Sequence, residues 1–391
     1  MPSDQRNRRN RLRLRLLRVA GRALATRPRR ATGGPTRVLL LRPDHVGDVL
    51  LTAPAVALLR ASLPGARLDY VVGPWSADAA RHGPTVDRVW PLAYPGFTRR
   101  RRANLVAPYA VLVREAARLR RERYDLAVVF RPDHWWGALL ALAAGVPVRV
   151  GGLTAETAPL LTHTYTAPPS EHAADQSLSM ARLALQACGA PHADLCDSAM
   201  FAVTEPARAA AVDLWTRYGL EGRTVIGIHP GAGTPLKSWP NEHWAKVVDG
   251  LLSDGLRVVL VGAPDDGELL AAIKTHFARE PVPAACGQSL DVSAALYQRC
   301  ALVIALDSGA AHLAAAVGTP TVRLYGPAPP DTFGPWPRRA DQHVLMTRRL
   351  ACVPCGHLEA PPCGARALPA CMLALGADDV LNVARAQLAR V

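Results

Sequence analysis

The sequence predicts an α/β protein with two doubly wound domains, each built on a parallel sheet. Short apolar runs rich in β-branched residues alternate with helix-length amphipathic segments, as in βαβ units. The alternation occurs in two consecutive series, which a polar helical segment at 205–218 separates. A chain of 391 residues is also too long for one ordinary hydrophobic core and fits two.

The two series predict the following elements. In the first we expect helices at 51–62 and 111–123, and strands at 38–42, 68–72, 88–92, 126–130 and 148–151. In the second we expect strands at 225–229, 257–261, 301–305 and 321–325. Each run is brief, as in buried parallel strands.

Ligands of such sheets bind beyond the carboxyl ends of the strands, where loops lead into helices. Candidate site residues therefore follow the strands, and we expect the two domains to face each other across a cleft. The expected division is a basic arm at 1–35, a first domain at 36–200, a second domain at 201–345 and a cysteine-containing tail at 346–391.

Most of the net charge of +14 lies in the first 30 residues, which carry +10 and leave +4 for the remainder. Within 6–30, arginines are interleaved with apolar residues, namely Leu12, Leu14, Leu16, Leu17, Val19 and Leu24. A basic amphipathic helix of this kind suits an anionic membrane surface. The alternative is a solvated arm without fixed structure. Nucleic acid is not expected as a partner, because the rest of the chain is nearly balanced in charge.

We expect neither a secretory leader nor a membrane span. Charges interrupt every apolar run of the arm, and the best apolar stretch elsewhere, 135–148, is short and ends at Arg149. We expect a cytoplasmic protein, either free or peripheral on the inner face of the cytoplasmic membrane.

The first strand leads into RPDHVGD instead of G-x-G-x-x-G, and the chain has no Walker A motif. An NAD enzyme or a P-loop ATPase is therefore not expected, and neither is a cofactor.

Three loops of the second domain suit a nucleotide-sugar. In HPGAGTPLKSWP, Gly231 and Gly233 allow close backbone approach, and Lys237 offers a positive charge to phosphate. A flexible turn with a surface lysine is the alternative. In LVGAPDD, Asp266 could bind a ribose diol or be a solvated loop acid.

The third loop is DSGAAHL. Asp307 ends a strand, and Ser308, Gly309, Ala310 and Ala311 open a helix whose free N–H groups suit a pyrophosphate. Asp307 would then bind sugar hydroxyls; otherwise it is an N-cap.

Asp48 follows Gly47 at the end of the first strand and has no lysine or arginine next to it in sequence. It suits the removal of a proton from an acceptor hydroxyl. It could also be the N-cap of the helix expected at 51–62.

The motifs VLLLRPDHVGDVLLTAPAVALLRASLP, HPGAGTPLKSWPNEHW, LVGAPDD and DSGAAHLAAAVGTPTVRLYGP, followed by FGPWP, occur in this order between about 37 and 337. Together they resemble glycosyltransferase family nine, the family of the ADP-heptose:lipopolysaccharide heptosyltransferases. The resemblance implies a GT-B fold whose last helices cross back onto the first domain. It also implies metal-independent, inverting transfer, usually of heptose from ADP-heptose, to a hydroxyl of a lipopolysaccharide-like or other glycan acceptor.

The resemblance also implies roles for single residues. Asp48 matches the catalytic aspartate, Lys237 the phosphate-contacting lysine and Asp307 the sugar-binding aspartate. Residues 308–311 match the phosphate-binding turn, and Asp266 stands where heptosyltransferases place a ribose-binding glutamate. The shorter Asp266 and the charged RPDH before Gly47 depart from the family pattern.

Acceptor-binding candidates are Gly47, His45, Arg99 and Arg100, because clustered arginines can fork onto anionic oxygens. In FRPDHWWG, Asp133, His134 and the tryptophans either stack on sugar or pack in the core. We expect no metal site. A zinc site with four thiolates is the alternative for the tail cysteines, which are Cys352, Cys355, Cys363 and Cys371.

The sequence thus predicts a glycosyltransferase. Two other functions stay open: a non-catalytic protein that binds nucleotide-sugars or glycans, and a GT-B sugar-nucleotide epimerase or hydrolase.

Overall fold

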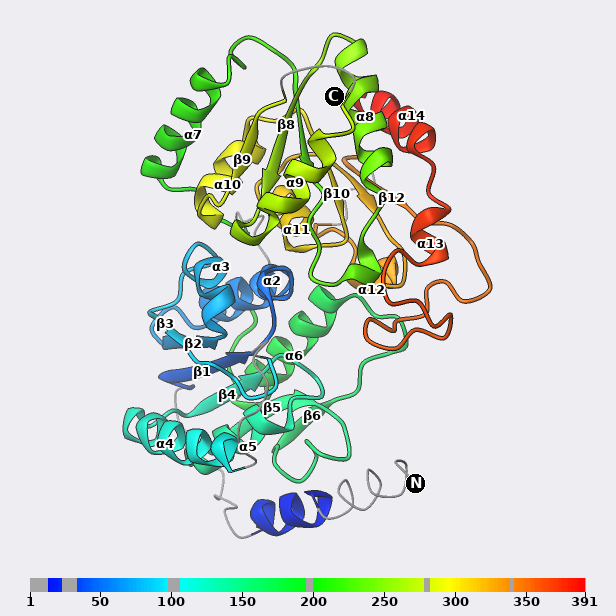
Figure 1. Ribbon diagram of the computed structural model, residues 1–391. Helices are drawn as coiled ribbons and strands as arrows, with labels where there is room; N and C mark the ends of the chain where they lie inside the picture. Colours follow the sequence, from blue (N-terminus) through cyan, green and yellow to red (C-terminus); the bar gives the residue numbers. More distant parts are fainter. Residues whose placement is uncertain are drawn as a thin grey trace. The chain divides into compact units, whose positions relative to one another are not determined.

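The computed structural model describes residues 13–22, 34–97, 106–194, 200–277, 282–337 and 341–390. The chain forms two compact units, Met1–Ser198 and Ala199–Val391. Each unit has a sheet between layers of helices (Figure 1), as the sequence predicts.

The described part of the first unit contains a six-stranded parallel sheet in the order β3-β2-β1-β4-β5-β6. Its central strand, β1, pairs with β2 on one side and β4 on the other. The strands are β1 (Arg37–Arg42), β2 (Arg67–Val72), β3 (Arg88–Pro91), β4 (Leu126–Val129), β5 (Val148–Gly152) and β6 (His163–Tyr165). Because the strands are parallel, their carboxyl ends share one edge of the sheet.

Helices cover both faces of this sheet (Figure 1). α4 (Ala107–Glu122) and α5 (Trp135–Ala143) pack on the face to which Leu39 and Leu41 of β1 point. α4 buries Leu112, Ala116 and Leu119, which the helical repeat places on one side. The opposite face carries α2 (Val46–Ser62) and α6 (Ala173–Ala187), which pack together; the short α3 (Ala77–Arg81) packs against α2.

The arm contributes a helix at 13–22 that docks onto this unit. Leu17 is buried in the core cluster of the α4 and α5 face. Arg13 donates to Glu156 at 3.0 Å, and its guanidinium lies 5.4 Å from the ring centroid of Trp135. Leu16 and Val19 stay exposed at 59% and 63%. The helix is therefore amphipathic as expected, but Leu17 faces protein. Leu12 and Leu24 lie outside the described residues.

The described part of the second unit also has a six-stranded parallel sheet, in the order β12-β11-β10-β7-β8-β9. Its strands are β7 (Val225–His229), β8 (Arg257–Gly262), β9 (Ala284–Cys286), β10 (Leu302–Leu306), β11 (Thr321–Leu324) and β12 (His343–Met346). Its helices are α7 (Glu205–Arg217), α8 (Asn241–Ser253), α9 (Gly267–Lys274), α10 (Leu290–Gln298), α11 (Gly309–Ala316), α12 (Pro330–Phe333), α13 (Ala370–Leu373) and α14 (Ala377–Leu388).

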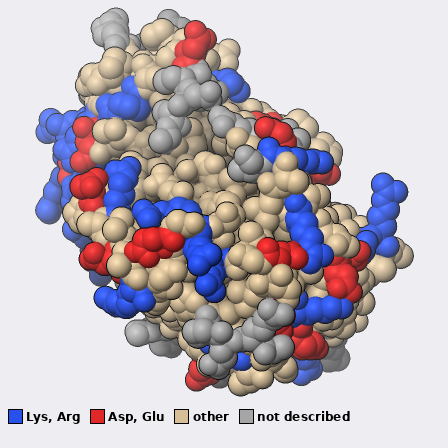
Figure 2. All heavy atoms as spheres, turned by 90° about the horizontal axis from the view of Figure 1, so that it is seen from above, with Lys and Arg blue, Asp and Glu red and all other residues tan. Residues whose placement is uncertain are grey.

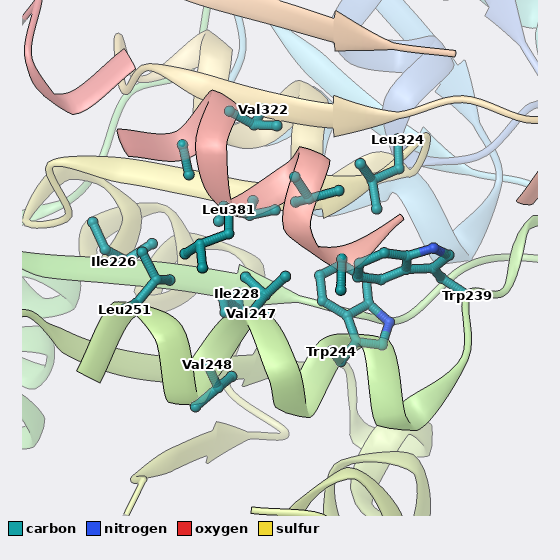
Figure 3. Close-up of a cluster of buried hydrophobic side chains, with 14 of the residues drawn as sticks. Ile226, Ile228, Trp239, Trp244, Val247, Val248, Leu251, Val322, Leu324 and Leu381 are labelled. Atoms are coloured by element: carbon teal, nitrogen blue, oxygen red, sulfur yellow. The ribbon is translucent and has the colours of Figure 1, made fainter. Parts of the chain in front are cut away.

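The C-terminal helix α14 packs on the second unit. Leu381 of α14 lies beside Val247 of α8 and Ile228 of β7 (Figure 3). A Cβ added at Gly250 would lie 2.3 Å from Leu381 Cδ2, so the glycine lets the two helices approach closely. We expected the last helices to cross back onto the first domain. Instead, the apolar face of α14 completes the core of the second.

Three strands that the structure contains were not predicted from the sequence. They are β6, β9 and β12, which are only three or four residues long. Edge strands of this length carry too few apolar residues for a pattern to emerge. None of the described helices has the length and apolarity needed to cross a membrane. On the face shown in Figure 2, Lys and Arg side chains of the described residues lie among Asp and Glu side chains, as the small net charge outside the arm suggests.

We predict that Leu381→Ala lowers the free energy of unfolding by about 2–4 kcal/mol, because it removes buried methyl groups and leaves a cavity between α14 and α8. Urea denaturation measures the change. Leu373→Ala in α13 is the control, since Leu373 is 50% exposed and its loss should change stability by less than about 0.5 kcal/mol. Equal stability of both variants would contradict the packing role of α14.

Candidate active site

Asp48 lies in the first turn of α2, just beyond the carboxyl end of β1. The helix begins at Val46 with His45 as N-cap residue, so the expectation that Asp48 caps the helix is wrong. A carboxylate in a first helical turn is favoured by the helix dipole. The Asp48 side chain is 29% exposed, which leaves it accessible to a substrate.

Arg42, the last residue of β1, reaches the Asp48 carboxylate. One guanidinium nitrogen donates to Asp48 Oδ1 at 3.2 Å, another to the Phe130 carbonyl at 2.8 Å, and Nε lies 2.8 Å from Asp44 Oδ2. Asp44 also pairs with Arg131. Asp48 therefore has a basic neighbour, contrary to what its sequence context suggests. The first turn of α2 folds back over the end of the strand that carries Arg42.

This network leaves Asp48 less acidic than an ordinary aspartate. Burial, followed by the negative charge of Asp44, raises the pKa of Asp48, and these effects outweigh the opposing influence of Arg42 and Arg131. For Asp44 the balance is reversed. Burial raises its pKa, but Arg42 and Arg131 together hold it below the ordinary value. Asp44 thus stays charged and pairs with both Arg42 and Arg131.

A repeated tetrapeptide builds the network, and the sequence reading missed it. RPDH begins on the last residue of β1 as Arg42–His45, and it follows β4, the neighbour of β1 in the sheet, as residues 131–134. Arg131 pairs with Asp44 of the first copy and, at 2.7 Å, with Asp133 of its own. Two identical charged segments after neighbouring parallel strands were the available signal, because their ends must share one edge of the sheet.

His134 of the second copy is a core residue. It is 5% exposed, and neither ring nitrogen has a hydrogen-bond partner among the described residues. Its ring packs against Tyr94, Phe97 and Trp136 at centroid distances of 5.2, 5.5 and 6.3 Å. Burial lowers the pKa of His134 to about 4, so the imidazole is neutral near pH 7. These aromatic residues therefore pack in the core and do not offer a sugar-stacking surface.

The other candidates for acceptor binding have different outcomes. His45 is exposed, with its ring centroid 5.7 Å from that of Trp75. Gly47 lies beside Asp48 in the first turn of α2. Arg99 and Arg100 lie outside the described residues.

In the second unit, Lys237 and Asp307 come together although 70 residues separate them. Lys237 Nζ donates to Asp307 Oδ2 at 2.5 Å and to the Asp307 carbonyl at 3.3 Å. The two side chains are only 17% and 6% exposed. Both residues follow strands that pair in the sheet, β7 and β10, whose carboxyl ends are adjacent. Their pairing places a cation and a carboxylate at one edge of the sheet.

The N-terminus of α11 directly follows Asp307. Ser308 is the N-cap residue, so the alternative that Asp307 caps this helix is wrong. Gly309, Ala310 and Ala311 form the first turn, whose N–H groups have no carbonyl partner within the helix. The Ser308 hydroxyl oxygen is buried and has no hydrogen-bond partner among the described residues. This group of donors is suited to an anion.

Gly231 and Asp266 also come together at this edge. A Cβ at Gly231 would lie 2.4 Å from Asp266 Oδ2, whereas one at Gly233 would meet nothing within 4 Å. Asp266 Oδ2 accepts from the Ala263 N–H at 2.8 Å and lies 3.8 Å from His229 Nε2. Burial lowers the pKa of His229, although Asp266 acts in the opposite direction. The glycine therefore provides the space that the Asp266 carboxylate occupies.

The four tail cysteines differ in their burial. Within the described ranges, no group of three or more His, Cys, Asp or Glu side chains is placed to hold a metal ion. Cys371 is buried in the core of the second unit, while Cys352 and Cys363 are exposed.

Two Rossmann-like units, each built on a six-stranded parallel sheet, are the architecture of the GT-B fold. The family model of glycosyltransferase family 9 (heptosyltransferase) matches residues 113–360, more than half of the chain. The chain belongs to this family and is a glycosyltransferase.

A curated relative supports this assignment, and solved structures share the fold. Lipopolysaccharide heptosyltransferase 2 of Escherichia coli K12 is 27% identical over 333 residues, which cover 80% of this chain and 88% of the relative. The fold is similar to the glycosyl transferase family 9 structure from Veillonella parvula DSM 2008, with a TM-score of 0.74, 23% identity and coverage of 91% and 98%. It is also similar to E. coli heptosyltransferase WaaC with ADP, with a TM-score of 0.65, 20% identity and coverage of 90% and 99%.

Proposed function

We propose that this glycosyltransferase moves heptose from ADP-heptose to a hydroxyl of a lipopolysaccharide-like acceptor, with inversion, without a metal and with Asp48 as general base. The observation that carries the proposal is the state of Asp48. Its carboxylate is partly exposed, and burial together with Asp44 raises its pKa toward the range that suits proton abstraction. The names of the relatives supply the sugar and the acceptor class, and the ADP in the WaaC structure supplies the nucleotide.

The second unit would hold the donor. Lys237 and the first turn of α11, with the Ser308 hydroxyl, would bind the diphosphate, because they combine a cation with free N–H donors. Asp307 would accept hydrogen bonds from sugar hydroxyls, and Asp266, next to Gly231, from the ribose. Gly233 leaves open space beside this loop.

The reaction then follows from these roles. Asp48 takes the proton of the acceptor hydroxyl. The hydroxyl oxygen forms a bond to the anomeric carbon of the donor, on the side opposite the diphosphate. The bond from that carbon to the diphosphate oxygen breaks, and ADP leaves with one more negative charge. Lys237 and the N-terminus of α11 would stabilise this charge, so that the diphosphate could leave without the help of a metal ion.

We predict that Asp48→Asn lowers kcat by about 10² to 10⁴, because it removes the base. Binding of ADP, measured by titration calorimetry, should stay within about twofold of the wild-type chain. The matched control is Asp78→Asn, which changes an exposed first-turn aspartate of the neighbouring helix α3 and should retain full activity. Near-normal turnover by Asp48→Asn would refute the role of the base.

The pKa of Asp48 predicts the pH profile. The base works only when deprotonated, so kcat/KM should fall as the pH drops through a pKa that lies above that of an ordinary aspartate. Asp44→Asn removes a neighbouring negative charge and releases Arg42 and Arg131 toward Asp48. Both changes lower the pKa of Asp48, so the acidic limb should move to lower pH by about one unit. A limb that stays in place or moves to higher pH contradicts this electrostatic role of Asp44; thermal unfolding checks that the variant folds.

We also propose that the helix at 13–22 contacts an anionic membrane surface. Leu16 and Val19 lie one helical turn apart and are exposed, and Arg15 and Arg18 beside them are exposed too. Such a face can insert apolar side chains while its arginines meet lipid phosphates.

We predict that Leu16→Ser with Val19→Ser reduces flotation with phosphatidylglycerol vesicles severalfold and spares activity on a soluble acceptor. High salt should weaken the binding of the wild-type chain. Deletion of residues 1–30 is the less specific test, because it also removes Leu17 from the core. Val212→Ser with Leu373→Ser, two exposed positions of the second unit, is the control. Vesicle binding that survives the change at Leu16 and Val19 would exclude this face.

A further inference from the structure

Arg323 is a fully buried cation in the second unit. It lies on β11, between β10 and β12, opposite Ala305 in the register of β10 and β11, and is 0% exposed. A guanidinium stays protonated even when buried. Burying such a charge is costly unless an opposite charge accompanies it.

The hydrogen-bond contacts of Arg323 are with a hydroxyl, a carbonyl and an imidazole. Nε donates to Thr321 Oγ1 at 3.0 Å, and one terminal nitrogen donates to the Ala311 carbonyl at 2.8 Å. The other lies 3.4 Å from Nδ1 of His312. Arg323 takes part in none of the ion pairs formed among the described residues. Burial accordingly lowers the pKa of Arg323.

The buried charge lies beside the first turn of α11. Ala311 belongs to that turn, and the carboxylate whose charge acts on Arg323 is Asp307. Asp307 already pairs with Lys237 at 2.5 Å. Asp307 is thus paired with Lys237, while Arg323 has no carboxylate of its own; the Ser308 hydroxyl at the same helix N-terminus also has no partner among the described residues. The turn has a surplus positive charge before any ligand binds.

We infer that Arg323 is a specificity-determining residue whose counter-ion is the diphosphate of the donor. The inference rests on the proposed donor site and deepens it. Arg323 does not touch the ligand; it lies beneath the helix turn and adds a fixed positive potential to the N–H groups above it. Nucleoside diphosphates gain from this potential, and uncharged nucleosides do not. The same potential favours departure of the diphosphate, which gains a negative charge when the sugar leaves.

Titration calorimetry with ADP, AMP and adenosine tests the inference. Arg323→Met keeps the volume of the side chain and removes the charge. We expect its ADP affinity to fall about ten- to fiftyfold, the size expected of one unit charge acting over roughly 7–10 Å at an effective dielectric of about 20. AMP should lose less, and adenosine should bind as it does to the wild-type chain. Arg323→Lys keeps the charge and should keep most of the ADP affinity.

Arg149→Met provides a matched control, because Arg149 is also buried and donates to carbonyls, of Leu160 and Val146, but belongs to the first unit. Its ADP affinity should be unchanged. The melting temperature of Arg323→Met should be equal to or above that of the wild-type chain, since a buried charge is replaced by an apolar side chain. If Arg323→Met does not fold, Arg323→Gln takes its place, because it retains hydrogen-bond donors.

The outcomes separate this inference from the proposed function. Unchanged ADP affinity in the neutral variants overturns the role of Arg323 and leaves the donor site standing. An equal loss for ADP and adenosine also overturns it, because a merely structural role would weaken both. A wild-type chain that does not bind ADP overturns the proposed donor, and the inference with it.

Discussion

Asp44 is held between Arg42 and Arg131, and the chemistry of the first unit depends on this buried arrangement. If Asp44 were neutral, the charges of both arginines would act mainly on Asp48 and lower its pKa. A carboxylate with a lowered pKa is a poor base. Because Asp44 is charged, it pairs with Arg42 and disfavours the negative charge of an ionised Asp48. Asp44 therefore pairs with an arginine at the end of each of two neighbouring strands, while burial and the charge of Asp44 raise the pKa of Asp48.

The two units treat charge in opposite ways. At the edge of the first sheet, acids and arginines are nearly balanced, and the balance sets the basicity of one carboxylate. At the edge of the second sheet, the two positive charges of Lys237 and Arg323 outnumber the single negative charge of Asp307. The dipole of α11 adds further positive potential there. On the proposed mechanism, the first environment suits a proton acceptor and the second a departing diphosphate. Parallel strands make both environments possible, since they gather residues from distant parts of the sequence at one edge.

The sequence predicted the α/β class, the two sheets and most central strands, because buried parallel strands leave uninterrupted apolar runs such as 225–229. It could not predict the short edge strands or the placement of α14, whose apolar face fits either domain. The candidate site divides in the same way. Asp48, Lys237 and Asp307 were singled out because motifs mark the ends of strands, and the structure places all three beyond strand ends. The pairing of Arg42 with Asp48 was missed because it depends on the first turn of α2, and Arg323 was missed because a lone arginine within an apolar strand has no motif.

The pair of Lys237 with Asp307 suggests how the donor site changes when it fills. Without a donor, the lysine and the aspartate neutralise each other, which keeps two poorly exposed charges from remaining unpaired. On the proposed binding mode, a diphosphate draws Lys237 toward its oxygens, and the Asp307 carboxylate becomes available to accept from sugar hydroxyls. Arg323 makes this exchange less costly, because its fixed charge remains near Asp307 when the lysine moves. Binding of the phosphates and recognition of the sugar are then coupled through one carboxylate.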